Sequence, residues 1–160
     1  MIDRKKVEAG GLIYKDHIGM VGLIGIPTHP GIGGRYFSEL ADASIHIELI
    51  VNLHDGNKYD HILVCVDKNH LEGAIEITEK IHEEVNSHAV IHDDQVALVC
   101  ISSLDFDKSQ VIAGQMFKAL GDNSINIQGI STSVSSVTCM ISAHDLEKAL
   151  SVLRQAFILP

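Results

Sequence analysis

An internal duplication is the feature that most limits how this chain can fold. Segment 34–51, GRYFSELADASIHIELIV, aligns with segment 114–131, GQMFKALGDNSINIQGIS, at a shift of 80 residues, and eight of the 18 positions are identical. Segment 66–77 aligns with segment 141–152 at a shift of 75, so the second copy has lost five residues between the two matches. The repeat predicts two copies of one folding unit within the 160 residues.

Both copies have the same order of predicted elements. Several strand segments are short apolar runs, and in the longer helical segments apolar residues recur at every third or fourth position. Strand, helix, strand, strand, helix, strand is the order of the ferredoxin-like fold, in which two helices cover one face of an antiparallel sheet. The sequence therefore predicts an α+β fold made of two βαββαβ units in tandem. The elements are expected at 19–26, 31–43, 46–53, 59–66, 69–86 and 88–92, and then at 96–102, 108–121, 127–133, 136–142 and 146–157.

The ends of the chain suggest how the two units are completed. Only the last three residues follow the final predicted helix, too few for a closing strand, whereas segment 7–14, VEAGGLIY, is an additional strand-like run before the first copy. We expect 7–14 to cross over and complete the sheet of the second copy. The predicted units are 17–92 and 93–160, the latter completed by the N-terminal strand.

Composition narrows the class of protein. Apolar residues make up 46% and charged residues 21%, which is typical of a folded domain. The longest apolar runs are far shorter than the roughly 20 residues of a membrane helix, and we expect no signal peptide. A net charge of −9 disfavours nucleic acid and anionic membranes as partners. Cys65, Cys100 and Cys139 each lie in an apolar run, which suits a reducing cytoplasm.

A glycine-rich stretch, GIGGRY, precedes the first predicted helix at residues 31–36. It has neither the spacing of a dinucleotide-binding loop nor the Lys-Ser/Thr ending of a P-loop, so phosphate binding is disfavoured. In one explanation, Pro30-Gly31 turns the chain and Gly33-Gly34 lets the helix lie close to the sheet. In the other, the free N–H groups of that helix N-terminus hold a small carboxylate.

The sequence contains no convincing catalytic or metal-binding arrangement. Among the ten histidines, the pairs His88/His92 and His54/His61 lack a third ligand at suitable spacing. The serine-rich turn at 131–133 is not in the context of a nucleophile elbow. We therefore predict a binding protein with no catalytic residue, no metal and no cofactor.

Four motifs resemble the tandem ACT regulatory region of aspartate kinases. They are PxHPG…FxxLAxAxIxIELIV at 27–51, HDDQVALV at 92–99, FxAL…INIQGISTS at 117–133 and DLEKALxVLRQAF at 145–157. The resemblance extends from about Val7 to the C-terminus, and the layout looks like the separate small regulatory subunit of some of these enzymes. The KFGG[ST]S opening of the kinase domain is absent. The resemblance therefore implies a non-catalytic protein that regulates an aspartate kinase.

The resemblance also implies a ligand and partners. In that family lysine or threonine binds between ACT units and inhibits the kinase, and ACT units of two chains pack together. The expected partners are thus a small amino acid, a second copy of the chain through its sheets, and a kinase catalytic subunit. In the first copy the implied ligand-binding residues are Thr28, His29, Gly31, Ile32, Gly33, Gly34, Glu48 and Asn52. In the second copy they are Ser109, Gln110, Val111, Asn126, Gln128, Ser131, Thr132 and Ser133.

Several positions depart from the family pattern. Thr28 replaces the usual acid of the first loop and Asn52 replaces a common glutamine; in the second copy Gln110-Val111 replaces Pro-Gly, and Gln128 replaces the strand acid. The first loop is therefore the better candidate site, and the second copy could be a packing interface only. Two alternatives stay open: a stand-alone ACT sensor for another enzyme or a transcription system, and an assembly module that has lost ligand binding.

Overall fold

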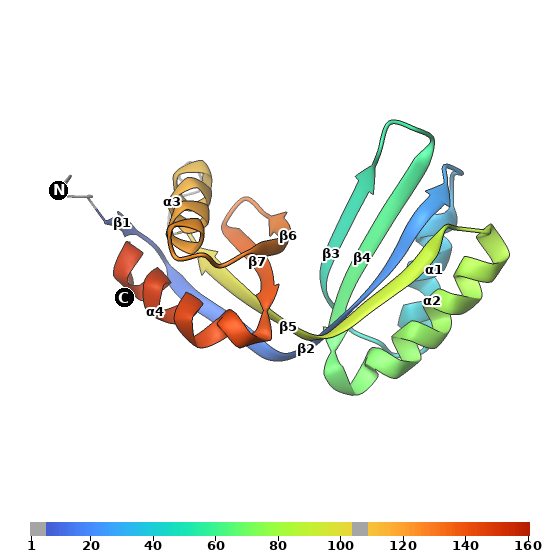
Figure 1. Cartoon of the computed structure of the whole chain (residues 1–160), viewed down its shortest axis with the longest axis horizontal. Helices are drawn as coiled ribbons and strands as arrows, with labels where there is room; N and C mark the ends of the chain where they lie inside the picture. Colours follow the sequence, from blue (N-terminus) through green and yellow to red (C-terminus); the bar gives the residue numbers. More distant parts are fainter. Residues whose placement is uncertain (1–5, 104–108) are drawn as a thin grey trace. The chain divides into compact units, whose positions relative to one another are not determined.

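The chain divides into two compact units. The structure is a computed structural model that describes residues 6–103 and 109–160. The first unit comprises His17–Gln95, and the second combines residues 6–16 with residues 96–160. Each has a sheet with two helices on one face (Figure 1). The predicted α+β class with two ferredoxin-like units is confirmed.

The first unit has the strand order β3-β4-β2-β5, in which β2 pairs antiparallel with β4 and β4 with β3. The helices α1 and α2 lie side by side, as Figure 1 shows. A short 3-10 turn, Lys68–His70, precedes α2 and is capped by the Asp67 carboxylate, which accepts a hydrogen bond from the N–H of Asn69 at 2.8 Å. The elements are β2 (Gly11–Pro27), α1 (Ile32–Asp42), β3 (Ile47–His54), β4 (Tyr59–Asp67), α2 (Leu71–Val85) and β5 (Ala89–Ser102).

The second unit repeats this arrangement with the strand order β2-β5-β7-β6. The antiparallel pairs β5/β7 and β6/β7 correspond to β2/β4 and β3/β4 of the first unit. Its elements are α3 (Ser109–Asp122), β6 (Ile127–Thr132), β7 (Ser136–Ser142) and α4 (Leu146–Ala156). In the described part of the chain, no helix is long and apolar enough to span a membrane.

The strands β2 and β5 are longer than the sequence predicts. Segments 7–14 and 19–26 were expected to be separate strands, but β2 runs without a break from Gly11 to Pro27. Residues 13–17 are exposed, so they lack the alternating apolar pattern by which a half-buried strand is recognised. Each unit receives part of this strand: the N–H of Gly10 donates to the carbonyl of Ser102, and the N–H of His88 donates to that of Ile24, both at 2.8 Å.

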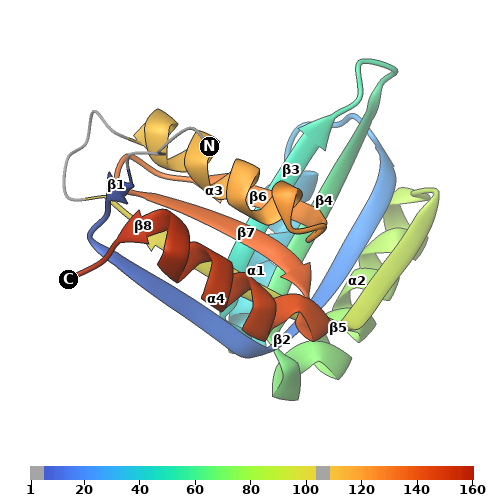
Figure 2. The same cartoon turned by 60° about the vertical axis from the view of Figure 1, so that its left-hand side comes forward.

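The last residues form a strand that the sequence did not predict. The helix was expected to reach Phe157, but α4 ends at Ala156, and β8 (Phe157–Ile158) pairs parallel with β1 (Val7–Glu8). Figure 2 shows these two short strands beside each other. Phe157 is 2% exposed and belongs to the core of the second unit. Burial of this large ring therefore outweighs continuation of the helix by one residue.

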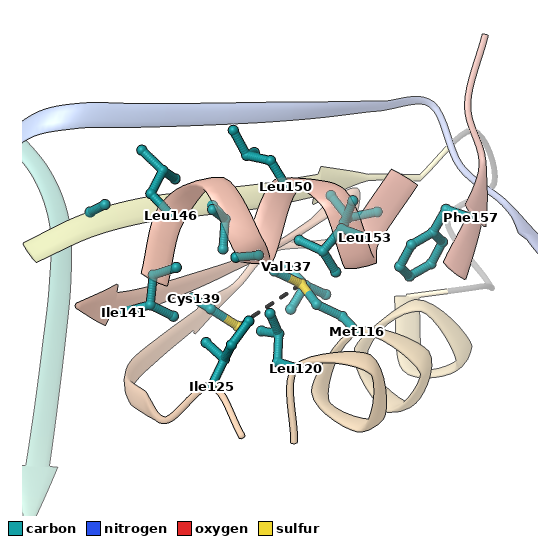
Figure 3. Close-up of a cluster of buried hydrophobic side chains, with 14 of the residues drawn as sticks. Met116, Leu120, Ile125, Val137, Cys139, Ile141, Leu146, Leu150, Leu153 and Phe157 are labelled. Carbon is teal, nitrogen blue, oxygen red and sulfur yellow. Dashed lines mark hydrogen bonds between the residues drawn. The ribbon is translucent and has the colours of Figure 1, made fainter. Parts of the chain in front are cut away.

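The two cores occupy the same place in their units, between the helices and the sheet. In the second unit, side chains from α3, α4, β5 and β7 form the core, and within it the sulfur atoms of Met116 and Cys139 are 3.9 Å apart (Figure 3). In the first unit the core contains a polar pair instead. The hydroxyls of Tyr36 and Thr78 are 2.6 Å apart, and both residues are fully buried. Burial raises the pKa of Tyr36, and the hydrogen bond with Thr78 partly offsets that rise.

Candidate functional site

The loop between β2 and α1, together with the first turn of α1, supplies six of the eight predicted ligand-binding residues of the first unit. Thr28 and His29 are exposed, and Gly31 is the N-cap of α1 with a φ of 98°. Only glycine adopts this backbone conformation without strain, which explains the Pro30-Gly31 pair. Ile32, Gly33 and Gly34 then form the first turn of the helix, and the N–H of Arg35 donates to the Gly31 carbonyl at 3.0 Å.

The N-terminus of α1 opens into a pocket. No side chain caps this helix, and its first turn contains no acidic residue, so its first N–H groups can bind an external acceptor. The pocket has a volume of about 300 Å3. It brings the predicted loop together with Arg35 of α1 and with two apolar residues of α2 that the sequence analysis missed. Its lining residues are His29, Pro30, Gly31, Ile32, Arg35, Ile81 and Val85.

Arg35 is held at the rim of this pocket by ion pairs between the two helices. Its guanidinium pairs with the Glu84 carboxylate and lies 3.4 Å from that of Glu39. Lys80 approaches Glu39 to 2.8 Å, and its hydrogen bond is the main cause that lowers the pKa of Glu39. A ligand carboxylate at the pocket would therefore meet an oriented guanidinium, in competition with Glu84.

Packing does not explain the glycines at positions 33 and 34. A Cβ added to Gly34, or to its equivalent Gly114 in the second unit, would meet no atom within 4 Å, and one added to Gly33 would only touch the Phe37 ring at 3.9 Å. The proposal that these glycines let the helix lie close to the sheet is thus wrong. Glycine weakens a helix interior by about 0.5–1 kcal/mol relative to alanine, and no packing contact in the structure offsets this cost.

The two predicted residues of β3 lie on different faces of the sheet. Asn52 is paired with Ile62, a core residue, so it lies on the face that carries the helices. Glu48 is the extra residue of a β-bulge between Ile47 and Leu49. Burial and, to a smaller degree, the Glu48 carboxylate raise the pKa of Cys65 to about 12. Cys65 alternates with core residues and points to the opposite face. The structure therefore does not bring Glu48 and Asn52 together.

Another acid lies closer to the β2–α1 loop. The Asp60 carboxylate is 2.9 Å from Nδ1 of His54, and the same Nδ1 lies 3.4 Å from the hydroxyl of Thr28. His54 and Asp60 were not among the predicted residues. The sequence did contain an indication of these two residues. Both lie close to the predicted Asp55-Gly56 hairpin turn, and His54 follows Asn52 at the two-residue spacing of one strand face.

The corresponding residues of the second unit are more scattered. Gln110 and Val111 are exposed in the first turn of α3, which Ser109 begins; the Ser109 side chain lies outside the described part. Asn126 precedes β6, and Gln128 occupies the same bulge position as Glu48. The other three residues, Ser131, Thr132 and Ser133, end β6 and enter the turn to β7.

The serine turn is held by its own hydrogen bonds. The hydroxyls of Ser133 and Ser136 are 2.8 Å apart, the Ser133 hydroxyl accepts a hydrogen bond from the N–H of Ser135 at 3.2 Å, and the N–H of Ser133 donates to the Ser136 carbonyl at 2.9 Å. Residues of the turn thus act as hydrogen-bond partners for one another. The serines at 133 and 136 can therefore be explained by the stability of the turn, without a ligand.

Comparison with known families decides what kind of unit this is. The family model described as ACT domain matches residues 99–157. The chain contains an ACT domain. The curated aspartokinase of Thermus thermophilus is 30% identical over 159 residues, or 98% of this chain, and the aspartate kinase of Pseudomonas fluorescens is 32% identical over 134 residues. The chain spans only 38% of the length of the Thermus enzyme and 32% of that of the Pseudomonas enzyme.

Solved structures place the similarity in the regulatory portion of these enzymes. The regulatory subunit of aspartate kinase from Thermus thermophilus, in its ligand-free form, is similar with a TM-score of 0.85 and 28% identity. The match covers 94% of this chain and 99% of that one. A structure of aspartokinase alpha and beta subunits matches with a TM-score of 0.83 and 25% identity over 97% of its chain. The similarity of this ACT-containing chain is therefore to the regulatory portion of these enzymes.

Metal chemistry finds no support in the described residues. Across residues 6–103 and 109–160, no three side chains of His, Cys, Asp or Glu are grouped so as to hold a metal ion. Two histidines of the first unit have other contacts: His61 accepts a hydrogen bond from the N–H of Gly25 at 3.3 Å, and the ring centroids of His88 and Tyr59 are 4.3 Å apart. These contacts fix the backbone around the candidate site.

Proposed function

We propose that the chain is an amino-acid-binding regulatory protein that controls an aspartate kinase by feedback, with lysine or threonine as the effector. The observation that carries the ligand class is the uncapped N-terminus of α1 in a pocket of about 300 Å3. Backbone N–H groups and the positive end of the helix dipole both favour a carboxylate at this point. Arg35 at the rim adds a second favourable charge.

The amino group of such a ligand needs an acid or several acceptors. The usual acid of the first loop is Thr28 here, and Glu48 lies on the other face of the strand. Asp60 is connected to the loop through His54, whose Nδ1 contacts both the Asp60 carboxylate and the Thr28 hydroxyl. Glu84 and Glu39 lie around Arg35. If the ligand's ammonium group bound between the loop and either set of carboxylates, both charged groups of the ligand would have partners: its carboxylate at the N-terminus of α1 and its ammonium at the acids.

The partners follow from the same regulatory role. The similar structure of aspartokinase alpha and beta subunits supports a catalytic subunit as the protein that senses ligand binding. A homodimer through the sheets is supported by the edge strand β3 of the first unit, on which Ile50 and Leu53 are 43% and 60% exposed. Ligand binding would favour one arrangement of the ACT units over another, and the kinase would respond to that arrangement. A cytoplasmic location stays a prediction.

Titration with amino acids, followed by the backbone amide NMR signals, tests the proposal. We expect lysine or threonine to shift the amide signals of Ile32, Gly33 and Gly34, because their N–H groups would bind the carboxylate. The matched control is lysine amide or threonine amide, in which an amide replaces that carboxylate. If none of the twenty amino acids shifts these signals, the chain is not a sensor of amino acids.

That negative result would favour the assembly module. The second unit already supports such a role for one half of the chain, since Gln128 stands where the first unit has Glu48, and the serine turn is satisfied internally. A stand-alone sensor for another enzyme or a transcription system would bind the ligand in the same way. It would differ by leaving an aspartate kinase catalytic subunit unbound in a pull-down with this chain.

A further inference from the structure

The space between the two helices is lined by different residues in the two units. In the first unit, Glu39 of α1 pairs with Arg35 of the same helix and with Lys80 of α2. Neutral residues stand at the three equivalent positions of the second unit, which are Gln115, Ala119 and Gln155. None of these side chains is charged, so the ion pairs of the first unit cannot form between α3 and α4.

A cavity of about 230 Å3 lies between α3 and α4, and all three of these positions line it. Ala119 and Ala156 belong to its wall, where the first unit has the longer side chains of Glu39 and Ile81. Gln115 links the two helices beside the cavity, because its amide nitrogen donates to the Ala156 carbonyl at 3.3 Å. The cavity is smaller than the roughly 300–1,000 Å3 of sites for drug-sized molecules, so it suits a ligand about the size of an amino acid.

Three charged side chains at the cavity give it a net positive charge. Lys118 and Asp122, one turn apart on α3, approach each other to 3.3 Å, and Lys6 is the third. The pair is half exposed, and such pairs on a helix contribute only about 0.2–0.5 kcal/mol, less when the lysine precedes the acid as it does here. A ligand can therefore separate Lys118 from Asp122 at little cost and bind to both.

The end of α3 favours a positive group of such a ligand. The side-chain nitrogen of Asn123 donates to the Ala119 carbonyl at 2.8 Å, which leaves its side-chain oxygen as an acceptor. Asp122 precedes it with a carboxylate, and the C-terminus of a helix carries partial negative charge. An ammonium group has its partners here, whereas Lys6 and Lys118 can bind carboxylates.

We propose that this groove between α3 and α4 binds a small dicarboxylic amino acid, of which aspartate and glutamate are the simplest. Its two carboxylates and one ammonium group match the two lysines and the one acid at the cavity, charge for charge. The inference goes beyond the proposed function, because the groove belongs to the other unit and takes a different class of amino acid. It does not depend on lysine or threonine binding at α1.

Titration of the whole chain with aspartate and glutamate, followed by the backbone amide NMR signals, tests the proposal. We expect both to shift the signals of residues 115–123 and 152–156 and to leave those of residues 32–34 in place. Succinate lacks the ammonium group, and asparagine has one carboxylate fewer. Each of these two should bind about tenfold more weakly than aspartate, because one charge-assisted hydrogen bond is lost.

Substitutions at the cavity test the same site from the side of the protein. Ala119→Glu, which reproduces Glu39 of the first unit, should abolish the shifts because its carboxylate repels the ligand. Lys118→Gln changes only a half-exposed side chain and should weaken binding about threefold to tenfold. The matched control is Lys148→Gln, which removes an exposed lysine of α4 outside the cavity and should leave binding unchanged.

Three results would overturn this site. The first is an unchanged spectrum with both aspartate and glutamate, and the second is succinate binding as tightly as aspartate. The third is an equal loss of affinity in Lys118→Gln and Lys148→Gln, since the ligand would then respond only to the net charge of the unit. None of these results would affect the proposed function, which is tested by lysine and threonine at the signals of residues 32–34.

Discussion

The two units are copies of one fold, but their cores are built on different chemistry. At the centre of the first unit, Tyr36 of α1 and Thr78 of α2 form a hydrogen-bonded pair. Thr78 donates in turn to the carbonyl of Ala74 at 2.6 Å, so Tyr36 is the donor to Thr78. The equivalent positions of the second unit are Met116 and Leu153, both fully buried (Figure 3). One repeat thus tolerates a polar pair where the other has only apolar contacts.

In this pair the two buried hydroxyls depend on each other. Each hydroxyl of the pair has its partner, and the described residues include no buried side-chain nitrogen or oxygen without a hydrogen bond. A single exchange between the units breaks such a pair, because it leaves one hydroxyl without a partner in a place that water does not reach. Exchanging residues between equivalent positions of the two units therefore tests how much each partner of the pair contributes to stability.

The largest effect is expected from moving half of the polar pair into the second unit. Met116→Tyr places a larger ring and an unpaired hydroxyl beside Leu153. Overpacking and the unpaired hydroxyl should together destabilise the chain by about 2–5 kcal/mol. Urea denaturation, followed by circular dichroism, measures this loss.

Adding Leu153→Thr tests the cause. The new threonine can accept from the introduced tyrosine and donate to the carbonyl of Ala149, as Thr78 does to Ala74. We expect the double variant to be more stable than Met116→Tyr alone. If it is less stable, the loss in Met116→Tyr arises from volume and not from the missing partner.

The reverse exchange in the first unit should be milder. Thr78→Val keeps the shape of the side chain but leaves the Tyr36 hydroxyl buried without an acceptor, which should cost about 1–3 kcal/mol. Tyr36→Phe combined with Thr78→Val removes both hydroxyls and should cost less than Thr78→Val by itself. Equal stability of the single and double variants would contradict the idea that the two hydroxyls depend on each other.

The duplication made most of the fold predictable. Positions related by the shift of 80 residues also share details of backbone structure. Both units have a bulge at equivalent positions, after Ile47 and after Ile127. Ser44 and Ser124 have the same positive φ of 57°. Asp67 and Ser142 likewise cap equivalent 3-10 turns. Such local features depend on short-range sequence, and both copies preserve that sequence.

Features set by contacts distant in sequence were harder to predict. The exposed middle of β2 has no strand pattern, and the bulge that separates Glu48 from Asn52 inserts one residue, which reverses the face that each side chain occupies. The pocket residues Ile81 and Val85 read as ordinary core positions of α2. His54 was weighed only as a metal ligand, and its contact with Thr28 arises from the fold of the hairpin.

Two equivalent glycines, Gly34 in the first turn of α1 and Gly114 in the interior of α3, give a smaller effect that separates the two candidate sites. Gly34→Ala and Gly114→Ala each add a methyl group in open space, so each should stabilise its helix by about 0.5–1 kcal/mol. Only Gly34→Ala should also weaken lysine or threonine binding, because the new methyl group stands where the ligand approaches α1. Calorimetry on both variants checks this. Equal loss of affinity in the two would mean that the second unit binds the ligand as well.

The smallest effect concerns the ion pairs between α1 and α2, whose residues are not repeated at the equivalent positions of the second unit. Glu39 and Lys80 correspond to Ala119 and Gln155. The Lys80 hydrogen bond lowers the pKa of Glu39, so this carboxylate stabilises the folded state fully above its unfolded pKa of about 4.3, and the contribution is lost as pH falls through its lower folded pKa. Glu39→Ala should therefore lower Tm slightly at neutral pH.

That loss should fade as pH falls through the lowered folded pKa of Glu39, because the carboxylate is then protonated in both states. It should also shrink at about 1 M NaCl, where charges are screened within about 3 Å. Ala119→Glu is the matched change in the second unit. It should bring no gain in Tm, because Gln155 offers no ammonium group to pair with the new carboxylate. A Tm difference between wild type and Glu39→Ala that persists at low pH and high salt would mean that the methylene groups of Glu39, and not its charge, support the packing of α1 on α2.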